Sequence, residues 1–225
     1  MDAADASARE TLLLLIRHGQ TEWNREGRVQ GHTDSPLTDL GRAQADALAR
    51  ALEDGWLPGE RPAALVSSDL GRARATAAPM AAALGLEPEL IPDLREMNFG
   101  ALEGATRPEI PPEVADRLFG AKADPDFPAP GGESRRQMLE RARRALTDVA
   151  GRYGGRTVVA VSHGGVIGFY LRAVLGLSMS ERPRFQTANG SVAAFRLGAA
   201  RVRMMAWGLV PPLTPSSGGD SVGPR

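Results

Sequence analysis

The sequence of 225 residues contains no cysteine, only three histidines and no net charge. Without cysteine, the chain cannot perform thiolate catalysis or form zinc ribbons, iron–sulfur clusters or disulfides. Three histidines are too few for an imidazole-rich metal site, although they leave a carboxylate-based site open. Because 27 basic side chains balance 27 acidic ones, no broad basic surface is expected, and we predict neither a nucleic-acid nor a membrane partner.

Long hydrophobic runs are also missing. The N-terminal sequence MDAADASARE is acidic where a secretory signal is basic. The apolar run that follows it, Leu12 to Ile16, is too short for a signal core or a membrane span. We therefore expect a cytoplasmic protein.

The two ends of the chain differ from its middle. Residues 1–10 are predicted to be a flexible N-terminus, and residues 210–225 are so rich in Pro, Gly and Ser that we expect a flexible tail. Between them, residues 11–209 are predicted to form a single domain, because a chain of this length can bury a large core without cross-links.

Short apolar runs alternate with longer helical patterns across this domain. The run TLLLLI is typical of a strand that is buried on both faces of a parallel sheet. The expected strands cover 11–16, 63–66, about 88–91, 157–162, 191–197 and 202–207, and the expected helices cover 37–52, 70–84, 133–153 and 165–175. This order predicts an α/β protein, a three-layer α/β/α sandwich with a mostly parallel central sheet. The last strand pair could offer an edge to a second subunit, so a homodimer is possible.

The segment from about residue 100 to 131, which we call the lid, interrupts this alternation. It contains six prolines, Pro108, Pro111, Pro112, Pro125, Pro128 and Pro130. Their density predicts irregular structure with at most short helical pieces.

Unusual polar residues follow three of the predicted strands. They are Arg17-His18-Gly19, Ser67-Ser68-Asp69 with Arg72, and Ser162-His163-Gly164-Gly165. Ligands of an open parallel sheet bind at the carboxyl ends of its strands, where these residues are expected to meet. The helices that begin near Leu70 and Gly165 would direct free N–H groups at the same edge, which favours an anion. The combination indicates a site for a phosphoryl group.

The residue types suit phosphoryl transfer. Two arginines, Arg17 and Arg72, can pair with phosphate oxygens and stay charged. One histidine could attack phosphorus in line while the other, in its protonated form, stabilises the equatorial oxygens. Glu96, which lies beyond the expected edge strand, could supply a proton to the leaving alkoxide.

Several segments resemble the histidine phosphatase superfamily, the phosphoglycerate mutase-like enzymes. They are LLIRHGQTEWN, GHTDSPLTDLGRAQA, SSDLGRARATA, LREMNFGALEG, PGGES and VSHGG, which follow one another in the family's order and span roughly residues 12–195. A lone RHG would be weak evidence, whereas the ordered set is specific. The resemblance implies the phosphoglycerate mutase-like fold and a phosphohistidine mechanism without a metal or an organic cofactor.

The resemblance also implies roles for individual residues. His18 would become phosphorylated, Arg17, Arg72 and His163 would complete the phosphate pocket, and Glu96 would be the proton donor. Asn24 and the backbone N–H of Gly164 match family positions that contact the phosphate. Gln30 and Gly31 match a substrate-facing loop.

Several other residues have more than one possible role. Glu103 lies in the same block as Glu96 and either could be the acid; the family's LxExxFG pattern favours Glu96. His32 could be a surface histidine or a substrate contact. Ser67 and Ser68 are interpreted as helix caps, because no GxSxG elbow surrounds them. Arg74 is expected to face solvent.

Two activities are compatible with the resemblance. Hydrolysis of a small phosphorylated metabolite is our prediction, because the lid lacks the long, basic, tyrosine-containing insertion that is associated with the mutases, and Glu103 stands where the mutases usually carry an amide. A phosphoglycerate mutase is the alternative. A catalytically weak protein that binds a phosphorylated ligand is a third possibility, disfavoured because binding alone needs no proton donor.

Overall fold

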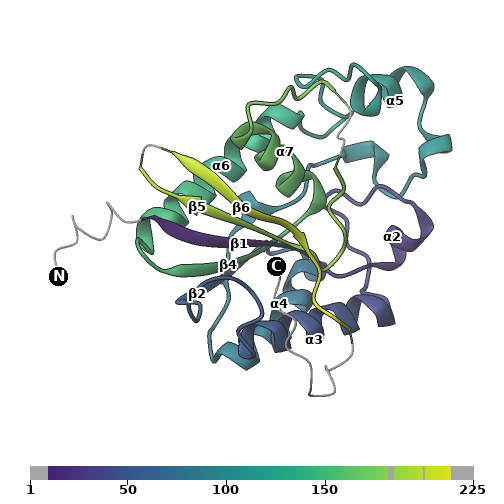
Figure 1. Ribbon diagram of the computed structural model, residues 1–225. Helices are drawn as coiled ribbons and strands as arrows, with labels where there is room; N and C mark the ends of the chain where they lie inside the picture. The colour runs from purple at the N-terminus through teal and green to yellow at the C-terminus, as the bar shows by residue number, and fades with distance from the viewer. Residues whose placement is uncertain (1–9, 182–184, 200, 214–225) are drawn as a thin grey trace.

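A computed structural model of the chain describes residues 10–181, 185–199 and 201–213, and these residues build a six-stranded sheet in the order β3-β2-β4-β1-β5-β6 (Figure 1). The strands are β1 (Thr11–Arg17), β2 (Ala64–Ser67), β3 (Glu89–Leu90), β4 (Thr157–Ser162), β5 (Val192–Leu197) and β6 (Val202–Leu209). β1 to β4 pair in parallel, whereas β5 and β6 run antiparallel. The expected mostly parallel sheet is therefore confirmed.

Helices cover both faces of this sheet. One layer contains α3 (Asp39–Glu53) and α4 (Gly71–Leu84), and the other contains α6 (Arg135–Arg152) and α7 (Gly164–Val174) (Figure 1). Each of the four predicted helices begins within two residues of its expected start. Local signals set several ends: the Thr38 hydroxyl caps α3, Ser134 and Gln137 form a capping box on α6, and Gly85 closes α4 with a φ of 65°.

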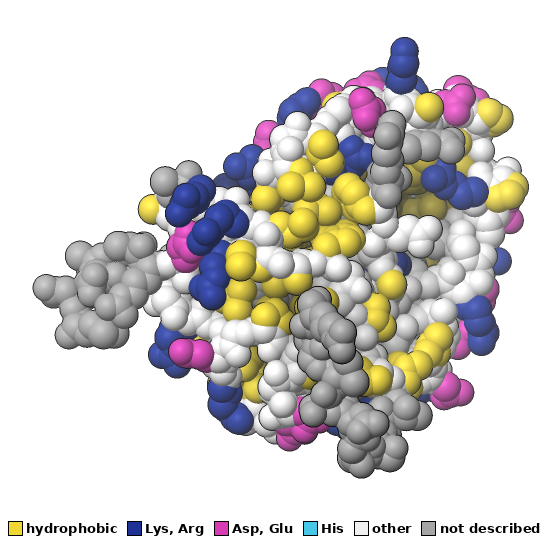
Figure 2. All heavy atoms as spheres, in the orientation of Figure 1, with side chains coloured by type: hydrophobic (Ala, Val, Ile, Leu, Met, Phe, Trp, Pro, Cys, Tyr) yellow, Lys and Arg dark blue, Asp and Glu magenta, His cyan; other side chains and the backbone are white. Residues whose placement is uncertain are grey.

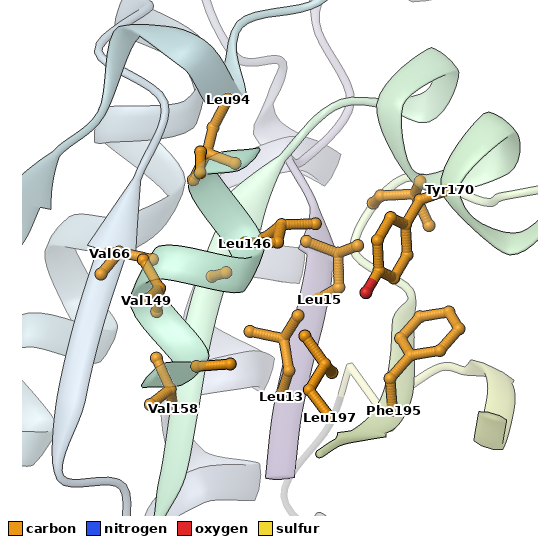
Figure 3. Packing of buried hydrophobic residues seen from close by; sticks show 14 of the residues in the cluster. Leu13, Leu15, Val66, Leu94, Leu146, Val149, Val158, Tyr170, Phe195 and Leu197 are labelled. Carbon is orange, nitrogen blue, oxygen red and sulfur yellow. The ribbon is translucent and has the colours of Figure 1, made fainter. Parts of the chain in front are cut away.

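The side chains of β1 alternate between two hydrophobic clusters. Leu13 and Leu15 pack with residues of α6 and α7, including Leu146 and Tyr170 (Figure 3). Leu12, Leu14 and Ile16 pack on the opposite face with residues of α3 and α4, namely Leu48, Ala49, Ala51, Leu52, Ala73, Ala77, Met80 and Leu84. Because both faces of the strand are buried, its sequence is apolar throughout, and the three-layer sandwich is confirmed.

The lid is attached to the domain by a hydrophobic cluster of its own. Ile110 and Leu118 of the lid pack with Met97, with Met138 of α6 and with Val166 of α7. The segment contains 3-10 helices at Gly100–Leu102 and Arg107–Glu109 and one α-helix, α5 (Pro112–Phe119). Pro112 occupies the first helical position, where the missing N–H costs no hydrogen bond. The proline count therefore predicted short helices correctly.

Two short helices were not individually predicted. They are α5 and α2 (Glu22–Glu26), which follows β1 and is closed by a capping box between Thr21 and Asn24. A helix of five residues has too few positions to show a 3.6-residue hydrophobic period, so the hydrophobic pattern does not reveal α2.

β6 forms one edge of the sheet and exposes Met204 and Met205. Figure 2 shows apolar side chains gathered on this face of the molecule. A homodimer that uses this edge stays a prediction. The predicted flexible ends also stay predictions, since residues 1–9 and 214–225 lie outside the described residues. No helix in the described part of the chain is both long and apolar enough to cross a membrane.

Candidate active site

His18 and His163 lie next to each other at the carboxyl ends of β1 and β4. The two strands are paired in parallel, with Arg17 opposite Ser162, and the His18 N–H donates to the Ser162 carbonyl at 3.0 Å. The two imidazole ring centroids are 5.1 Å apart and both rings are buried. The expected meeting of the strand ends is therefore observed.

A pocket of about 200 Å³ opens in front of His18. It is lined by Arg17, His18, Asn24, Arg28, Val29, Gln30, Gly31, Arg72, Glu96 and Phe99. Of the nine residues predicted for the site, seven are in this lining. The other two, His163 and Gly164, adjoin it: His163 contacts the His18 ring, and the backbone of Gly164 lies against the Arg17 side chain.

The orientation of His18 suits it for nucleophilic attack. Its Nδ1 lies 2.8 Å from the Gly19 carbonyl oxygen. A carbonyl can only accept, so Nδ1 carries the proton and Nε2 keeps its lone pair. Burial, followed by the charges of Arg17 and Arg72, lowers the pKa of His18 well below its usual value of 6.5. The ring is therefore neutral near pH 7.

His163 is held by a residue that we had interpreted only as a helix cap. Its Nε2 lies 2.8 Å from the Ser68 hydroxyl, which is fully buried. When Ser68 donates to Nε2, the proton of the neutral ring is on Nδ1, a buried atom with no partner among the described residues. The Ser68 hydroxyl also accepts from the N–H of Leu70, the N-cap residue of α4, at 3.3 Å, whereas the N–H of Gly71 at the start of the helix donates to Asp34 at 2.5 Å.

The expectation of a protonated His163 is not met in the free pocket. Burial and then the charges of Arg72, His18 and Arg17 lower the pKa of His163 well below 6.5. The sequence could not show this effect, because it depends on how many charges from separate segments surround the ring. A doubly negative phosphoryl group would oppose those charges and favour the protonated form.

Arg72 is fixed by three acceptors from one loop. Its Nη1 donates to the Thr33 carbonyl at 3.1 Å and to Asp34 at 2.8 Å, and its Nη2 donates to the Gly31 carbonyl at 2.7 Å. Arg17 donates from Nη1 to the Thr187 carbonyl at 2.5 Å. The Nε atoms of both arginines are buried without a partner among the described residues. Together with Nδ1 of His163, three unpaired donors therefore belong to residues that line or adjoin the pocket of His18.

Glu96 is held at the start of α7. Its Oε2 accepts from the Gly165 N–H at 2.9 Å, and its Oε1 accepts from the Met97 N–H at 2.9 Å. A Cβ at position 165 would lie 2.2 Å from Oε1 of Glu96, and a Cβ at position 164 would lie 3.2 Å from Nε of Arg17. The two glycines of SHGG therefore leave room for the carboxylate and the guanidinium group.

Arg141 of α6, which the sequence analysis missed, holds the loop that carries Glu96. It donates to three backbone carbonyls of this loop, those of Asp93, Arg95 and Glu96, at 2.9, 2.7 and 2.8 Å. It also pairs with Glu133 at 2.5 Å, and Glu133 in turn accepts from the Asn98 N–H. The acidic residue of PGGES was the available signal, but nothing in the sequence connects it to Glu96.

Glu103 has a different environment from Glu96. Its carboxylate accepts from the N–H groups of His32, Thr33 and Phe99 and from the Thr33 hydroxyl. Burial raises its pKa, but these hydrogen bonds outweigh burial, and the net pKa is lowered. A carboxylate that is fully used in the loop is poorly suited to be the acid, so the geometry favours Glu96.

The remaining predicted residues lie around the pocket in different ways. Asn24 accepts through Oδ1 from Thr21 N–H and from Asn189, which was also missed, so its amide nitrogen is the end left for a ligand. Gln30 is buried and its Oε1 has no partner in the described structure. Gly31 has a φ of 57°, and a Cβ there would lie 2.0 Å from Glu103. The Gly31 carbonyl accepts from Arg72, so this glycine helps to position the guanidinium group.

His32 lies against the loop of Glu96, whereas Arg74 faces solvent. Nε2 of His32 lies 3.0 Å from the Glu96 carbonyl, so the ring supports the same loop as Arg141. Arg74 is exposed, as expected. Within the described residues, no group of three or more His, Asp or Glu side chains is placed to hold a metal ion.

Comparison with known proteins gives a consistent result. A family model described as histidine phosphatase superfamily (branch 1) matches residues 13–210. A metal-independent phosphoserine phosphatase of Arabidopsis thaliana is 41% identical over 168 residues, which cover 72% of this chain and 68% of the relative. A probable phosphoglycerate mutase of Escherichia fergusonii is 38% identical over 180 residues, covering 79% and 81%. The solved structure of a mycobacterial glucosyl-3-phosphoglycerate phosphatase with VO3 is 32% identical with a TM-score of 0.76, covering 89% of this chain and 99% of that one.

Proposed function

The chain belongs to the histidine phosphatase superfamily, and we propose that it is a metal-independent phosphomonoester hydrolase that acts through a phosphohistidine on His18. The phosphatase class agrees with relatives that include a phosphoserine phosphatase and a glucosyl-3-phosphoglycerate phosphatase. The observation that carries the proposal is the set of three buried, unpaired donors, Nε of Arg17, Nε of Arg72 and Nδ1 of His163, around the pocket of His18.

Such a set of donors is suited to a phosphoryl group. Buried donors without partners are costly, and a phosphoryl group can pair with all of them through its three oxygens. Two guanidinium groups supply positive charge where the transferring group spreads its negative charge. The pocket therefore favours an anion with several acceptor oxygens.

In the first step, Nε2 of His18 attacks phosphorus opposite the ester oxygen. The N–P bond forms, the P–O bond to the leaving group breaks, and Glu96 gives its proton to the departing alkoxide. The Nδ1–H bond to Gly19 holds the ring in the tautomer that this attack needs.

In the second step, a water molecule attacks the phosphohistidine. Glu96, now a carboxylate, accepts a proton from this water as the new P–O bond forms and the N–P bond breaks. Phosphate leaves, and His18 and Glu96 return to their starting forms. Arg17, Arg72 and His163 stabilise the equatorial oxygens in both steps, with Asn24 and the N–H of Gly164 as further donors.

The substrate in this proposal is a small phosphorylated metabolite, as in the relatives named for phosphoserine and glucosyl-3-phosphoglycerate. The proposal includes neither a nucleic-acid partner nor a membrane partner. It also includes no metal or organic cofactor, so phosphate release is expected to be unchanged in EDTA.

The direct test is release of p-nitrophenol from p-nitrophenyl phosphate. We expect turnover by the wild type and background rates for His18→Ala, while Arg74→Ala, an exposed neighbour of Arg72 on α4, keeps the wild-type rate. Equal background rates for the wild type and His18→Ala would support a binding protein instead.

The mutase alternative has its own assay. Wild-type protein is given 3-phosphoglycerate with its bisphosphate primer. We expect phosphate release to exceed isomerisation. Efficient isomerisation with negligible phosphate release would overturn the hydrolase proposal.

A further inference from the structure

A second cavity of about 720 Å³ adjoins the pocket of His18. Arg17 and Glu96 line both cavities, so the two meet at these side chains. The larger cavity lies along the N-terminal half of α7 and the segment 185–189. We call it the leaving-group chamber.

The position of Glu96 connects this chamber to the reaction. The phosphoryl donors surround the smaller pocket, so the transferring group occupies that space. The ester oxygen must then face Glu96 to receive its proton. A leaving group that continues past Glu96 enters the leaving-group chamber, whose volume is within the range of sites that enclose whole organic ligands.

Aromatic and amide side chains line the chamber. Phe169 and Phe185 provide flat apolar surfaces. Gln44 accepts through Oε1 from the Gln20 N–H at 2.8 Å, and Gln20 accepts through Oε1 from Thr38 at 3.0 Å. Both amide nitrogens are therefore available as donors. Flat apolar surfaces with amide donors fit a ring that carries hydroxyl groups.

Small acidic leaving groups gain little from the described lining. Arg172 donates through its two terminal nitrogens to the carbonyls of Ser178 and Glu181. Arg17 also lines the phosphoryl pocket, and its Nε is unpaired. A carboxylate would therefore compete with these contacts for Arg172, and a small acidic ester would leave most of the chamber of about 720 Å³ unfilled.

We propose that the leaving-group chamber selects phosphate esters of uncharged, hydroxylated rings over small acidic esters, an inference that rests on the proposed function. Sugars and nucleosides share this chemistry. The proposal narrows the substrate class from small phosphorylated metabolites to esters whose alcohol carries a ring.

The first test compares kcat/KM of the wild type for four substrates. Glucose 6-phosphate and adenosine 5′-monophosphate represent the two ring sources, and phosphoserine and 3-phosphoglycerate represent small acidic esters. We expect the better ring substrate to exceed both acidic esters by about tenfold or more, a difference in the range that pocket contacts supply. The preferred ring source identifies sugar or nucleoside. A preference for either acidic ester overturns the proposal.

The second test fills the chamber. A Cβ on Gly168 of α7 would lie 4.0 Å from Cε2 of Phe185 and from Oγ1 of Thr187, which is ordinary contact. Gly168→Leu therefore extends a side chain into the chamber without a backbone clash, and leucine favours the helix over glycine. We expect kcat/KM for the ring substrate to fall about tenfold more than that for phosphoserine. An equal fall for both substrates contradicts the proposal.

A matched control and a second variant keep the test decisive. Gly151→Leu makes the same change in α6, where a Cβ meets nothing within 4 Å, and should leave the ratio of the two substrates unchanged. Phe169→Ala removes the aromatic surface and should raise KM for the ring substrate more than for phosphoserine. An unchanged ratio in both Gly168→Leu and Phe169→Ala overturns the chamber assignment. Failure of the hydrolase proposal is distinct, because the wild type then releases phosphate from none of the four substrates.

Discussion

The Ser68 hydroxyl lies 2.8 Å from Nε2 of His163, and both side chains are completely buried. This contact decides which ring nitrogen of the neutral His163 carries the proton. In the neutral ring, the unpaired Nδ1 has an N–H to offer a phosphoryl oxygen only when Ser68 donates to Nε2. Ser68 is thus a positioning residue for His163.

Replacing Ser68 tests this relationship. Ser68→Ala should lower kcat by about 5- to 30-fold, the value of one orienting hydrogen bond, with a smaller change in KM. Ser67→Ala is the control. This variant loses a hydrogen bond of the same length, 2.8 Å from the Ser67 hydroxyl to the Ser68 carbonyl, but that hydroxyl does not bond to His163. Steady-state kinetics with p-nitrophenyl phosphate measure both variants. Equal losses for the two would argue against a specific role of Ser68.

The two candidate acids are separated by amide substitutions. Glu96→Gln should lower kcat by about 10²- to 10⁴-fold for an alkyl phosphate, because the leaving alkoxide loses its proton donor. Glu103→Gln should stay within about tenfold of wild type but lower the free energy of unfolding by about 1–2 kcal/mol, since Glu103 accepts four hydrogen bonds. Kinetics and thermal melts check the pair. The reverse pattern would identify Glu103 as the acid.

Arg141 should act on turnover through Glu96. Arg141→Gln loosens the loop that carries the acid, so the rate should fall about tenfold more for an alkyl phosphate than for p-nitrophenyl phosphate, whose leaving group departs without a proton.

The control for Arg141 lies on the same helix. Arg136→Gln removes an exposed ion pair with Asp126 and should change neither rate by more than about twofold. A merely structural role for Arg141 would lower the rates for both substrates equally, and this outcome would exclude a positioning role.

The lowered pKa of both buried imidazoles predicts how stability depends on pH. The unfolded chain takes up protons near pH 6.5, whereas His18 and His163 stay neutral in the folded protein to lower pH. Since the unfolded state binds more protons, the free energy of unfolding should decrease as the pH falls below about 6.5, by up to about 1.4 kcal/mol per pH unit for each group.

Thermal melts at pH 7.5 and 5.5 in phosphate-free buffer check this dependence. His18→Ala lacks one of the two groups and should lose less stability between these pH values than the wild type. An identical or larger loss in the variant would mean that His18 titrates normally in the fold.

The fold could be predicted from the sequence because the signals for its strands and helix ends are local. The apolar run of β1, the Thr38 and Ser134 caps and the closing Gly85 each depend on residues that are neighbours along the chain. The predicted site residues also came together, since the carboxyl ends of parallel strands meet at one edge.

Residues that support the site from a distance were not predicted. Arg141 and Glu96 are 45 positions apart, Ser68 and His163 are 95 apart, and Asn189 is 165 from Asn24. None belongs to a motif whose spacing requires the contact. The neutral state of His163 in the free pocket was not predicted for the same reason, because its lowered pKa depends on burial and on arginines from β1 and α4.

In the proposed mechanism, His18 carries the phosphoryl group during turnover. The most direct measurement mixes the enzyme with a phosphomonoester, stops the reaction within milliseconds in alkali, in which phosphohistidine survives, and locates the added phosphoryl group by peptide mass spectrometry. We expect the label on His18, at neither His32 nor His163, and no label in His18→Ala. Rapid turnover with no label on His18, or with a label on another residue, would contradict it.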